Sequence, residues 1–326
     1  MNTDRLLKRA QQALARRDVE TLRQCARKLH MARHPVAYYY EASAYELEGN
    51  MEQAIETLQR GVRARPRDID RYQDLIQLLD RLERDEEALQ FCEAAIEKFE
   101  GTQKFTLYAH KIRILTSLER YPEALQAVDD ALQLPPPEYR AEYEEMLEPV
   151  RLGLLVKLKD HAGVRESLQR LERMAQENPD NPYLISNLYV AKASIARDLD
   201  GDIPAARALA QQALQYDRAN SAAINILYET GEPVPGTVHF YALQVASVVQ
   251  QQEDTETPEL RVSTYIIAAL NKEEAQRIAL EYESDALPDA TEIVNEGTVR
   301  REPKQNAPVG IVNIREEYYD LEDFYA

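Results

Sequence analysis

Apolar residues recur at helical spacing through the first part of the chain, most clearly in the segments 35–66, 69–100 and 105–136. Tyr, Leu, Ile and Ala stand three or four positions apart in these segments. This spacing places them along one side of an α-helix. A single helix pair cannot bury such a stripe alone, so neighbouring pairs must stack into a continuous core. The pattern therefore predicts stacked amphipathic helices.

The three segments are copies of one another. Alanine stands at the same place in each, at Ala54, Ala88 and Ala124, which are 34 and 36 residues apart. A helix pair repeating every ~34 residues resembles the tetratricopeptide repeat family, TPR for short. The aromatic and small positions that match the family pattern are Tyr38, Tyr72, Tyr108, Ala42, Gly61, Ala95 and Ala131. The alternative is a generic amphipathic bundle, which three copies in near register disfavour.

Weaker copies flank the three clear ones. They cover residues 3–34, 145–180 and 187–220, where alanine and leucine keep the helical spacing but the distance between copies grows to about 40 residues. We therefore expect a mostly α protein with a TPR-like α-solenoid of about six helix pairs, of which the last two are irregular.

The pattern changes after Asn220. Two prolines and two glycines in 229–237 indicate a linker. β-branched and aromatic runs then predict strands, with a helix between the second and third that begins at the N-cap Asn271. The strands are expected over 238–249, 260–270, 291–301 and 309–319. The predicted domains are a helical repeat domain, a linker and a small α+β domain of order β-β-α-β-β, at 1–228, 229–237 and 238–326.

Charge is unevenly distributed along the chain. The net charge is −18, yet residues 1–34 carry about +6, so the remainder carries about −24. An acidic body repels phosphate backbones, which argues against nucleic-acid binding, and it attracts basic protein partners. The basic residues of 1–34 are interpreted as a solvated helix face.

Motifs for catalysis or cofactor binding are missing. The sequence has no glycine-rich phosphate loop, no HExxH and no CxxC. His30 and His34 are four residues apart, but Pro35 ends the helix there and no third metal ligand is evident. The segment 198–202, DLDGD, lacks the later ligands of a calcium loop and is interpreted as a turn. We therefore expect no enzyme activity, no cofactor and no metal.

The two cysteines and the apolar runs bear on location. Cys25 and Cys92 stand at helix-core positions and are expected to be reduced and buried. No apolar run is long enough to span a bilayer, and the first residues do not form a signal peptide. The expected location is the cytoplasm, with no membrane contact.

The TPR resemblance implies a concave groove lined by the first helix of each pair. Family positions that contact ligands map to side chains of mixed aromatic and polar type, which are Tyr39, Ser43, Gln73, Gln77 and Arg113. Some TPR proteins grip the terminal carboxylate of heat-shock chaperones with Lys and Asn. Tyr39 and Ser43 replace the first of those residues here, so chaperone-tail binding is not expected.

The last twelve residues hold five acids and four aromatics. Such a segment can dock into a basic apolar groove on a partner or onto the basic residues of 1–34. Alternatively, its first tyrosines only finish a strand and the rest frays. The candidate contact residues are Tyr318, Tyr319, Phe324 and Tyr325.

These observations favour a scaffold or adaptor that binds a protein or peptide through its helical repeats. Two alternatives stay open. The first is an acidic inhibitor or immunity-type protein that neutralises a basic partner, suggested by the charge and the acidic segment. The second is an enzyme with a site in the α+β domain. Only His239, Tyr241 and nearby acids support this alternative. The oligomeric state is not predicted.

Overall fold

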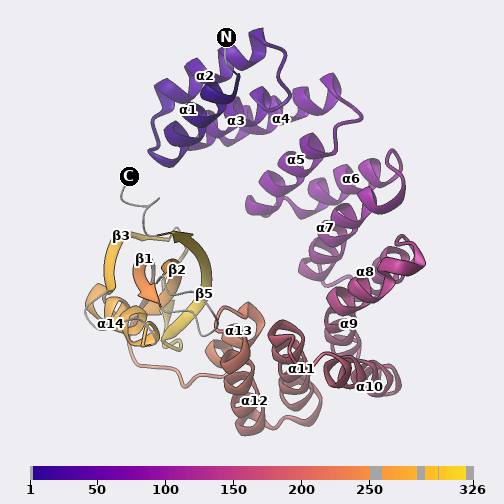
Figure 1. Ribbon diagram of the computed structural model, residues 1–326. Helices are drawn as coiled ribbons and strands as arrows, with labels where there is room; N and C mark the ends of the chain where they lie inside the picture. Colours follow the sequence, from indigo (N-terminus) through magenta and orange to yellow (C-terminus); the bar gives the residue numbers. More distant parts are fainter. Residues whose placement is uncertain (1–2, 250–258, 285–290, 300, 321–326) are drawn as a thin grey trace. The chain divides into compact units, whose positions relative to one another are not determined.

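A computed structural model describes residues 3–249, 259–284, 291–299 and 301–320. Over these residues the chain forms helices α1 to α13, then an antiparallel sheet with one more helix, α14 (Figure 1). The residues fall into two compact units, Met1–Leu154 and Leu155–Ala326, called unit 1 and unit 2 below. The predicted TPR-like array followed by an α+β region is confirmed.

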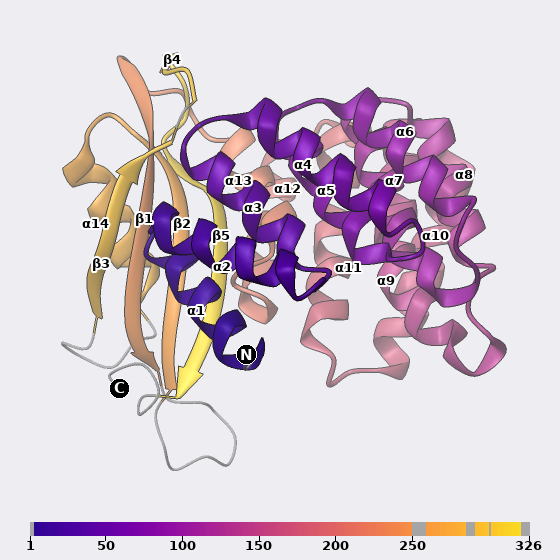
Figure 2. The same cartoon turned by 90° about the horizontal axis from the view of Figure 1, so that it is seen from above.

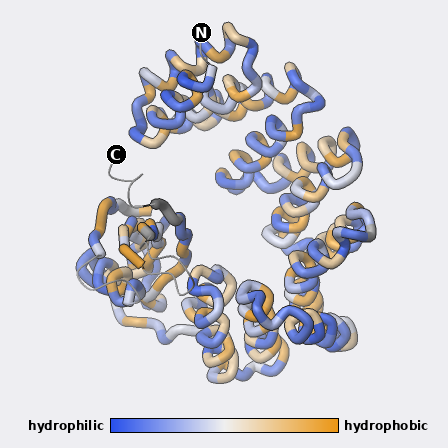
Figure 3. Tube along the Cα trace, in the orientation of Figure 1, coloured by the Kyte–Doolittle hydropathy of each residue, from blue (hydrophilic) through white to orange (hydrophobic). Residues whose placement is uncertain are grey.

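Unit 1 is built from antiparallel helix pairs. In chain order its helices are α1 (Thr3–Ala15), α2 (Val19–Met31), α3 (Ala37–Leu47), α4 (Met51–Ala64), α5 (Ile69–Arg81), α6 (Asp85–Ile96), α7 (Lys104–Ser117), α8 (Tyr121–Ala131) and most of α9 (Arg140–Lys157). Each has an apolar side, and Figure 3 shows blue and orange alternating along the helices of the array. The loosely fitting copy at 3–34 is therefore a helix pair like the others.

The same turn closes successive pairs. One residue between the two helices has a positive φ at Arg17, Gly49, Glu83, Glu119 and Lys159. A left-handed residue reverses the chain within a few residues, so the second helix returns beside the first. Aspartate or asparagine caps several of the second helices. Asp18, for example, accepts a hydrogen bond from the Thr21 amide at 3.0 Å.

Small residues set the helix spacing in the core. Ala54, Ala88 and Ala124 are fully buried. A Cβ added at Gly61 would lie 3.0 Å from the ring of Tyr38, so the aromatic and small positions of one repeat pack against each other. Cys25 and Cys92 are buried and free, as predicted. Burial raises the pKa of the Cys92 thiol to about 12, which keeps it unreactive.

Unit 2 continues the array and ends in the sheet. Its further helices are α10 (His161–Glu177), α11 (Pro182–Ile195), a π-helical turn η3 (Ala196–Asp200), α12 (Ile203–Tyr216) and α13 (Ser221–Glu229). The division between the units falls within α9, whereas the predicted domain limits follow the change from helix to strand. The residues after α13 run past Pro233, which forms an isolated bridge with Pro308.

The sheet is antiparallel, with strand order β3-β1-β2-β5, and the short β4 pairs with β1. Its elements are β1 (Thr237–Val249), β2 (Glu259–Ala269), α14 (Lys272–Tyr282), β3 (Thr291–Thr298), β4 (Lys304–Gln305) and β5 (Gly310–Asp320). Among the strands, sequence patterns missed β4, which is two residues long; they also did not predict helix α13. Figure 2 shows α14 on one side of the long strands. The predicted N-cap is present, since Asn271 Oδ1 accepts from the Glu274 amide at 2.8 Å.

The helices and the sheet of unit 2 share a core. Ile224 of α13 belongs to the same buried cluster as Leu243, Tyr265 and Ile267 of the strands and Ala279 of α14. Residues of one sheet face alternate into this cluster, as the alternation in 238–249 predicts. The sheet therefore packs directly on the end of the helical array.

Candidate protein-binding surface

The side chains predicted to bind a partner lie on the first helices of three successive pairs. Gln77 on α5 and Arg113 on α7 are exposed, whereas Tyr39 on α3 and Gln73 on α5 are half-buried. Ser43 is buried, and its hydroxyl donates a 2.9 Å hydrogen bond to the Tyr39 carbonyl, so it is occupied within its own helix. We call the exposed side of α3, α5 and α7 that carries these residues the first-helix surface.

Ion pairs connect the first helices across this surface. Glu46 of α3 pairs with Arg81 of α5 at 2.6 Å, and Asp80 of α5 pairs with Arg113 of α7. Sequence analysis did not predict these pairs. The sequence could have indicated them, because the acids Glu46 and Asp80 are 34 residues apart and occupy the same place in the repeat. The predicted anchor Arg113 is thus held in one orientation by a carboxylate of the neighbouring helix.

A partly buried carboxylate lies on α5. Asp74 of α5 is 2.7 Å from the Arg71 guanidinium, which is itself only 5% exposed. Burial raises the pKa of Asp74 to about 6, although the charge of Arg71 opposes the shift and those of Asp70 and Asp68 add to it. The first helix of this pair therefore carries an ionisable group that changes charge near neutral pH.

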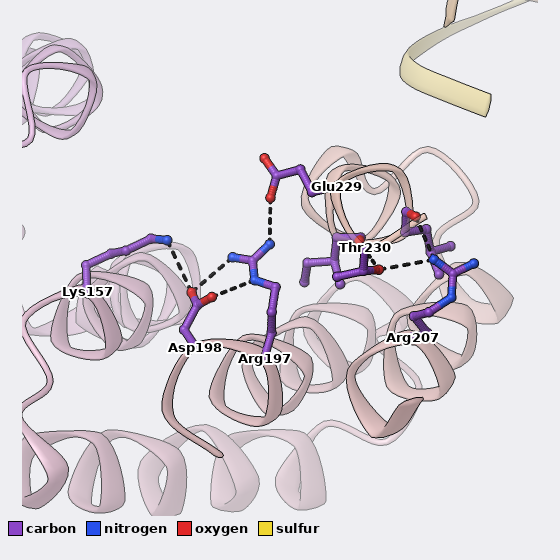
Figure 4. A network of polar contacts seen from close by, with 8 residues as sticks. Lys157, Arg197, Asp198, Arg207, Glu229 and Thr230 are labelled. Carbon is purple, nitrogen blue, oxygen red and sulfur yellow. Dashed lines mark hydrogen bonds and ion pairs between the residues drawn. The ribbon is translucent and has the colours of Figure 1, made fainter. Parts of the chain in front are cut away.

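Unit 2 has a comparable network of ion pairs (Figure 4). Lys157 of α9 reaches Asp198 at 3.1 Å, Asp198 pairs with Arg197 at 2.6 Å, and Arg197 reaches Glu229 of α13 at 2.7 Å. Nearby, Arg207 donates to the Leu227 carbonyl at 2.8 Å. Successive first helices are again joined by charge.

The segment DLDGD therefore has a structural role. Asp198 is held by cations, Gly201 ends the π-helical turn at a φ of 69°, and Asp202 caps α12 by accepting from the Ala205 amide at 3.0 Å. The interpretation of 198–202 as a turn between helices is confirmed.

The two neighbouring histidines face different groups. His30 Nε2 lies 2.9 Å from Glu41, whereas His34 Nδ1 accepts from the Val36 amide at 3.3 Å. Helix α2 ends at Met31, before His34. In the described part of the chain, no group of three or more possible metal ligands is gathered at one place.

A pocket of about 290 Å³ lies beside the sheet, lined by Tyr241, Leu243, Lys272, Glu296 and Gly297. Hydrogen bonds from Lys272, joined by one from Gln276, lower the pKa of Glu296 despite some desolvation. The acid therefore stays ionised and bound. His239 stands nearby, with its ring 6.5 Å from that of Tyr241.

A buried charge network lies between α14, the strands and the α12–α13 connection. Glu283 at the end of α14 accepts from Arg261 and from the Tyr265 hydroxyl. Arg218, which precedes α13, lies 3.5 Å from Glu283 and 2.9 Å from Glu316 of β5. Burial alone would raise the pKa of Glu283, but the hydrogen bonds from Tyr265 and Arg261 outweigh it, so the pKa is lowered. These side chains anchor the array to the sheet.

The aromatic residues near the end of the chain divide into two groups. The backbone of Tyr318 and Tyr319 continues β5 opposite Arg261 and Leu260 of β2. Phe324 and Tyr325 lie outside the described residues.

Comparisons with protein-family models and with curated proteins give no match. Several solved structures are similar in fold. PilF of Pseudomonas aeruginosa is 15% identical and has a TM-score of 0.45, with 68% of this chain and 94% of that chain covered. BtubC of P. vanneervenii is 19% identical, with a TM-score of 0.46 and coverage of 66% and 91%.

YrrB, described as a TPR protein with an unusual peptide-binding site, is 16% identical with a TM-score of 0.38 and coverage of 60% and 94%. No residue role is transferred from these structures to this chain. The helix pairs themselves define the fold as that of a TPR-like repeat protein. No helix in the described residues is both long enough and apolar enough to cross a membrane.

Proposed function

We propose that this protein is a scaffold that binds a partner protein or peptide on the first-helix surface, and that its role is binding and not catalysis. The observation that carries the proposal is the series of ion pairs that fixes Arg113 and Arg81 across α3, α5 and α7. A surface held in place loses little conformational entropy when it binds, which favours affinity. Half-buried Tyr39 and exposed Arg113 supply the aromatic and arginine anchors typical of interfaces.

The test compares two matched charge insertions in the full-length protein. Gln77→Arg alters the first-helix surface, whereas Gln90→Arg alters an exposed position on the second helix α6. Affinity purification with mass spectrometry should find partners that wild type and Gln90→Arg retain and that Gln77→Arg loses. If both variants retain the same partners as wild type, the binding surface lies elsewhere.

We further propose that the partner is basic. The charge of about −24 beyond residue 34 supports this, as does exposed Asp70 on the first helix α5. Affinity for the purified partner should then fall steeply as salt is raised from about 0.05 to 0.5 M, because screening weakens charge attraction. An affinity that does not change with salt would exclude a partner that is bound mainly by charge. It would also exclude the alternative that this protein is an acidic inhibitor.

We propose a cytoplasmic location for the protein. The free, buried thiols of Cys25 and Cys92 support it, since reducing compartments keep thiols unpaired. Fractionation of cells that express the tagged protein tests this, and recovery in the membrane or secreted fraction would contradict it.

A further inference from the structure

A second pocket lies in unit 1, between the neighbouring helices α2 and α3. It has a volume of about 230 Å³, and its lining residues are Arg23, Ala26, Arg27 and His30 of α2 with Glu41 and Tyr45 of α3. We call it the α2–α3 pocket. All of these residues belong to the first two helix pairs, so the pocket is formed entirely within unit 1.

The α2–α3 pocket is separate from the first-helix surface. Glu41 of α3 contacts His30 of α2 at 2.9 Å and Arg60 of α4 at 3.0 Å. Helices α2 and α4 are the second helices of their pairs, so Glu41 lies on the side of α3 that faces them. Tyr39 and Ser43 stand two residues before and after Glu41, and two residues correspond to a rotation of about 200° around a helix. The pocket and the first-helix surface therefore use opposite sides of α3.

One positive charge in the α2–α3 pocket is available to a ligand. The acid of the pocket, Glu41, is bound by Arg60 of α4. Arg23 pairs with Glu48 at the end of α3. Arg27 is exposed and has no ion pair within the described residues. A ligand that enters the pocket therefore meets the free guanidinium of Arg27.

A single free guanidinium matches a carboxylate. Arginine donates two parallel hydrogen bonds to a carboxylate, and one charge then balances one charge. A phosphate group carries about −1.5 to −2 at neutral pH and calls for a second free cation. The other cations that line the pocket, Arg23 and His30, already contact acids. The pocket is also smaller than the ~300–1,000 Å³ usual for small-molecule ligands, so it suits one or two side chains of a peptide.

The surroundings of the pocket favour an acidic segment over a free acid. Residues 1–34 carry about +6 in a chain of net charge −18. Exposed Lys28 follows Arg27 on α2, and exposed Arg33 follows the end of that helix. A segment with several carboxylates is attracted by these charges as well as by Arg27, whereas a free acid gains mainly from the pocket itself.

We propose that the α2–α3 pocket binds a glutamate or aspartate side chain from an acidic segment of a second protein. Arg27 donates the paired hydrogen bonds, and the basic side chains around the pocket attract the neighbouring acids of the segment. Since the first-helix surface is proposed to hold a basic partner, the protein can join two partners of opposite charge.

The experiment uses the full-length protein and two synthetic peptides, the acidic Ac-GSEESG-NH2 and the amide Ac-GSQQSG-NH2. Isothermal titration in about 0.05 M salt should show binding of the acidic peptide. Binding of the amide peptide should be at least ~10-fold weaker, because it offers no charge-assisted hydrogen bond. Free glutarate should also bind at least ~10-fold more weakly than the acidic peptide, because it is not held by the surrounding charges.

Substitutions at neighbouring positions locate the site. Arg27→Glu should weaken binding of the acidic peptide by at least ~10-fold, because attraction becomes repulsion. Lys28→Glu makes the same change of charge at an exposed position of α2 that does not line the pocket, and should weaken binding by ~3-fold at most, because salt screens it. Glu41→Gln removes the acid of the pocket and should strengthen binding by at least ~3-fold, because a repelling charge is lost. Circular dichroism checks that the variants are folded.

Four results would each overturn the proposal. The first is no binding of the acidic peptide at millimolar concentration, and the second is equal binding of the amide peptide or of glutarate. The third is an equal loss of affinity in Arg27→Glu and Lys28→Glu, and the fourth is weaker binding by Glu41→Gln. The Gln77→Arg variant should bind the acidic peptide as wild type does, so this proposal and the one for the first-helix surface can fail separately.

Discussion

Charged side chains join the elements of this protein in two ways, by exposed pairs between neighbouring helices and by a buried network at the sheet. In unit 1, ion pairs such as Glu46–Arg81 join neighbouring helices and remain open to solvent, with the Arg81 side chain 62% exposed. In unit 2, Arg261 and Glu283 form a pair that is almost completely buried. Arg218 joins this pair to Glu316 of β5, which lies 98 residues further along the chain. The repeat array is thus held by local contacts, whereas the sheet end depends on contacts between distant segments.

The energetic consequences differ accordingly. Exposed ion pairs contribute about 0–1 kcal/mol each, because water and salt screen them. Removing one partner of a buried pair costs about 3–5 kcal/mol, because the other charge is left in the interior. We therefore expect a large loss of stability when the buried network at the sheet is broken, and a small loss when an exposed pair between helices is broken.

The largest effect is expected for Glu283→Ala. It removes the acceptor that Arg261 and the Tyr265 hydroxyl share. The free energy of unfolding of unit 2 should therefore fall by about 3–5 kcal/mol. Urea unfolding followed by circular dichroism gives the loss, and hydrogen exchange assigns it to unit 2. The chain has no tryptophan, so fluorescence would report only on tyrosine.

Glu281→Ala is the matched control for this change. Glu281 is exposed on the same helix, and among the described residues it pairs only with Arg277, one turn away at 2.7 Å. It should cost at most ~0.5 kcal/mol, as helix-surface pairs do. Similar losses in the two variants would remove the distinction between buried and exposed charge.

A smaller effect concerns the pH dependence of unit 1. The pKa of Asp74 is about 6 in the folded protein against 3.8 for a fully solvated aspartate, so the folded state binds an extra proton between these pH values. Ionised Asp74 therefore destabilises unit 1 above pH 6, and the penalty is relieved as pH falls toward 4. The relief is at most about 3 kcal/mol, at 1.36 kcal/mol per pKa unit.

The measurement is the free energy of unfolding at several pH values for wild type and Asp74→Asn. Wild type should gain stability relative to the variant as pH falls from 7 to 4, with hydrogen exchange placing the change at α5. Parallel curves for the two proteins would show that Asp74 titrates normally.

The smallest effect is expected for Arg81→Ala. It removes the exposed partner of Glu46 and should cost about 0.2–1 kcal/mol, less at high salt. A double-mutant cycle with Glu46→Ala isolates the pair. A coupling above ~2 kcal/mol would mean that unit 1 depends on its ion pairs as unit 2 does, and would break the comparison.

Sequence reasoning succeeded where neighbouring residues decide the structure. The repeated alanines at Ala54, Ala88 and Ala124 located the helix pairs, because close helix approach needs a small side chain at a fixed interval. Asn271 located the start of α14, since its side chain caps the helix three residues away. The alternation of apolar and polar residues located the strands of the sheet, because it too depends on neighbouring residues.

Sequence reasoning failed to predict the contacts between residues that are distant along the chain. Nothing in the local pattern around Arg218 indicates that its partners are Glu283 and Glu316, because those contacts exist only after the sheet has formed. The strand order β3-β1-β2-β5 was likewise out of reach, since it depends on which edges the connections leave free. On the candidate surface, the predicted anchor Arg113 proved to be bound by Asp80 of the neighbouring helix, a contact that its own position does not reveal.

Helix α13 is followed by strand β1, and no second helix completes its pair in the part of the chain that the structure describes. Stacked repeats leave an apolar face at each end of the array, and such an end must be covered to keep the protein soluble and to prevent stacking onto another array. Ile224 of α13 is covered by strand and α14 side chains, among them Leu243 and Ala279. The sheet is therefore the terminator of the repeat: it takes the place of the next helix and sets the length at which the array stops.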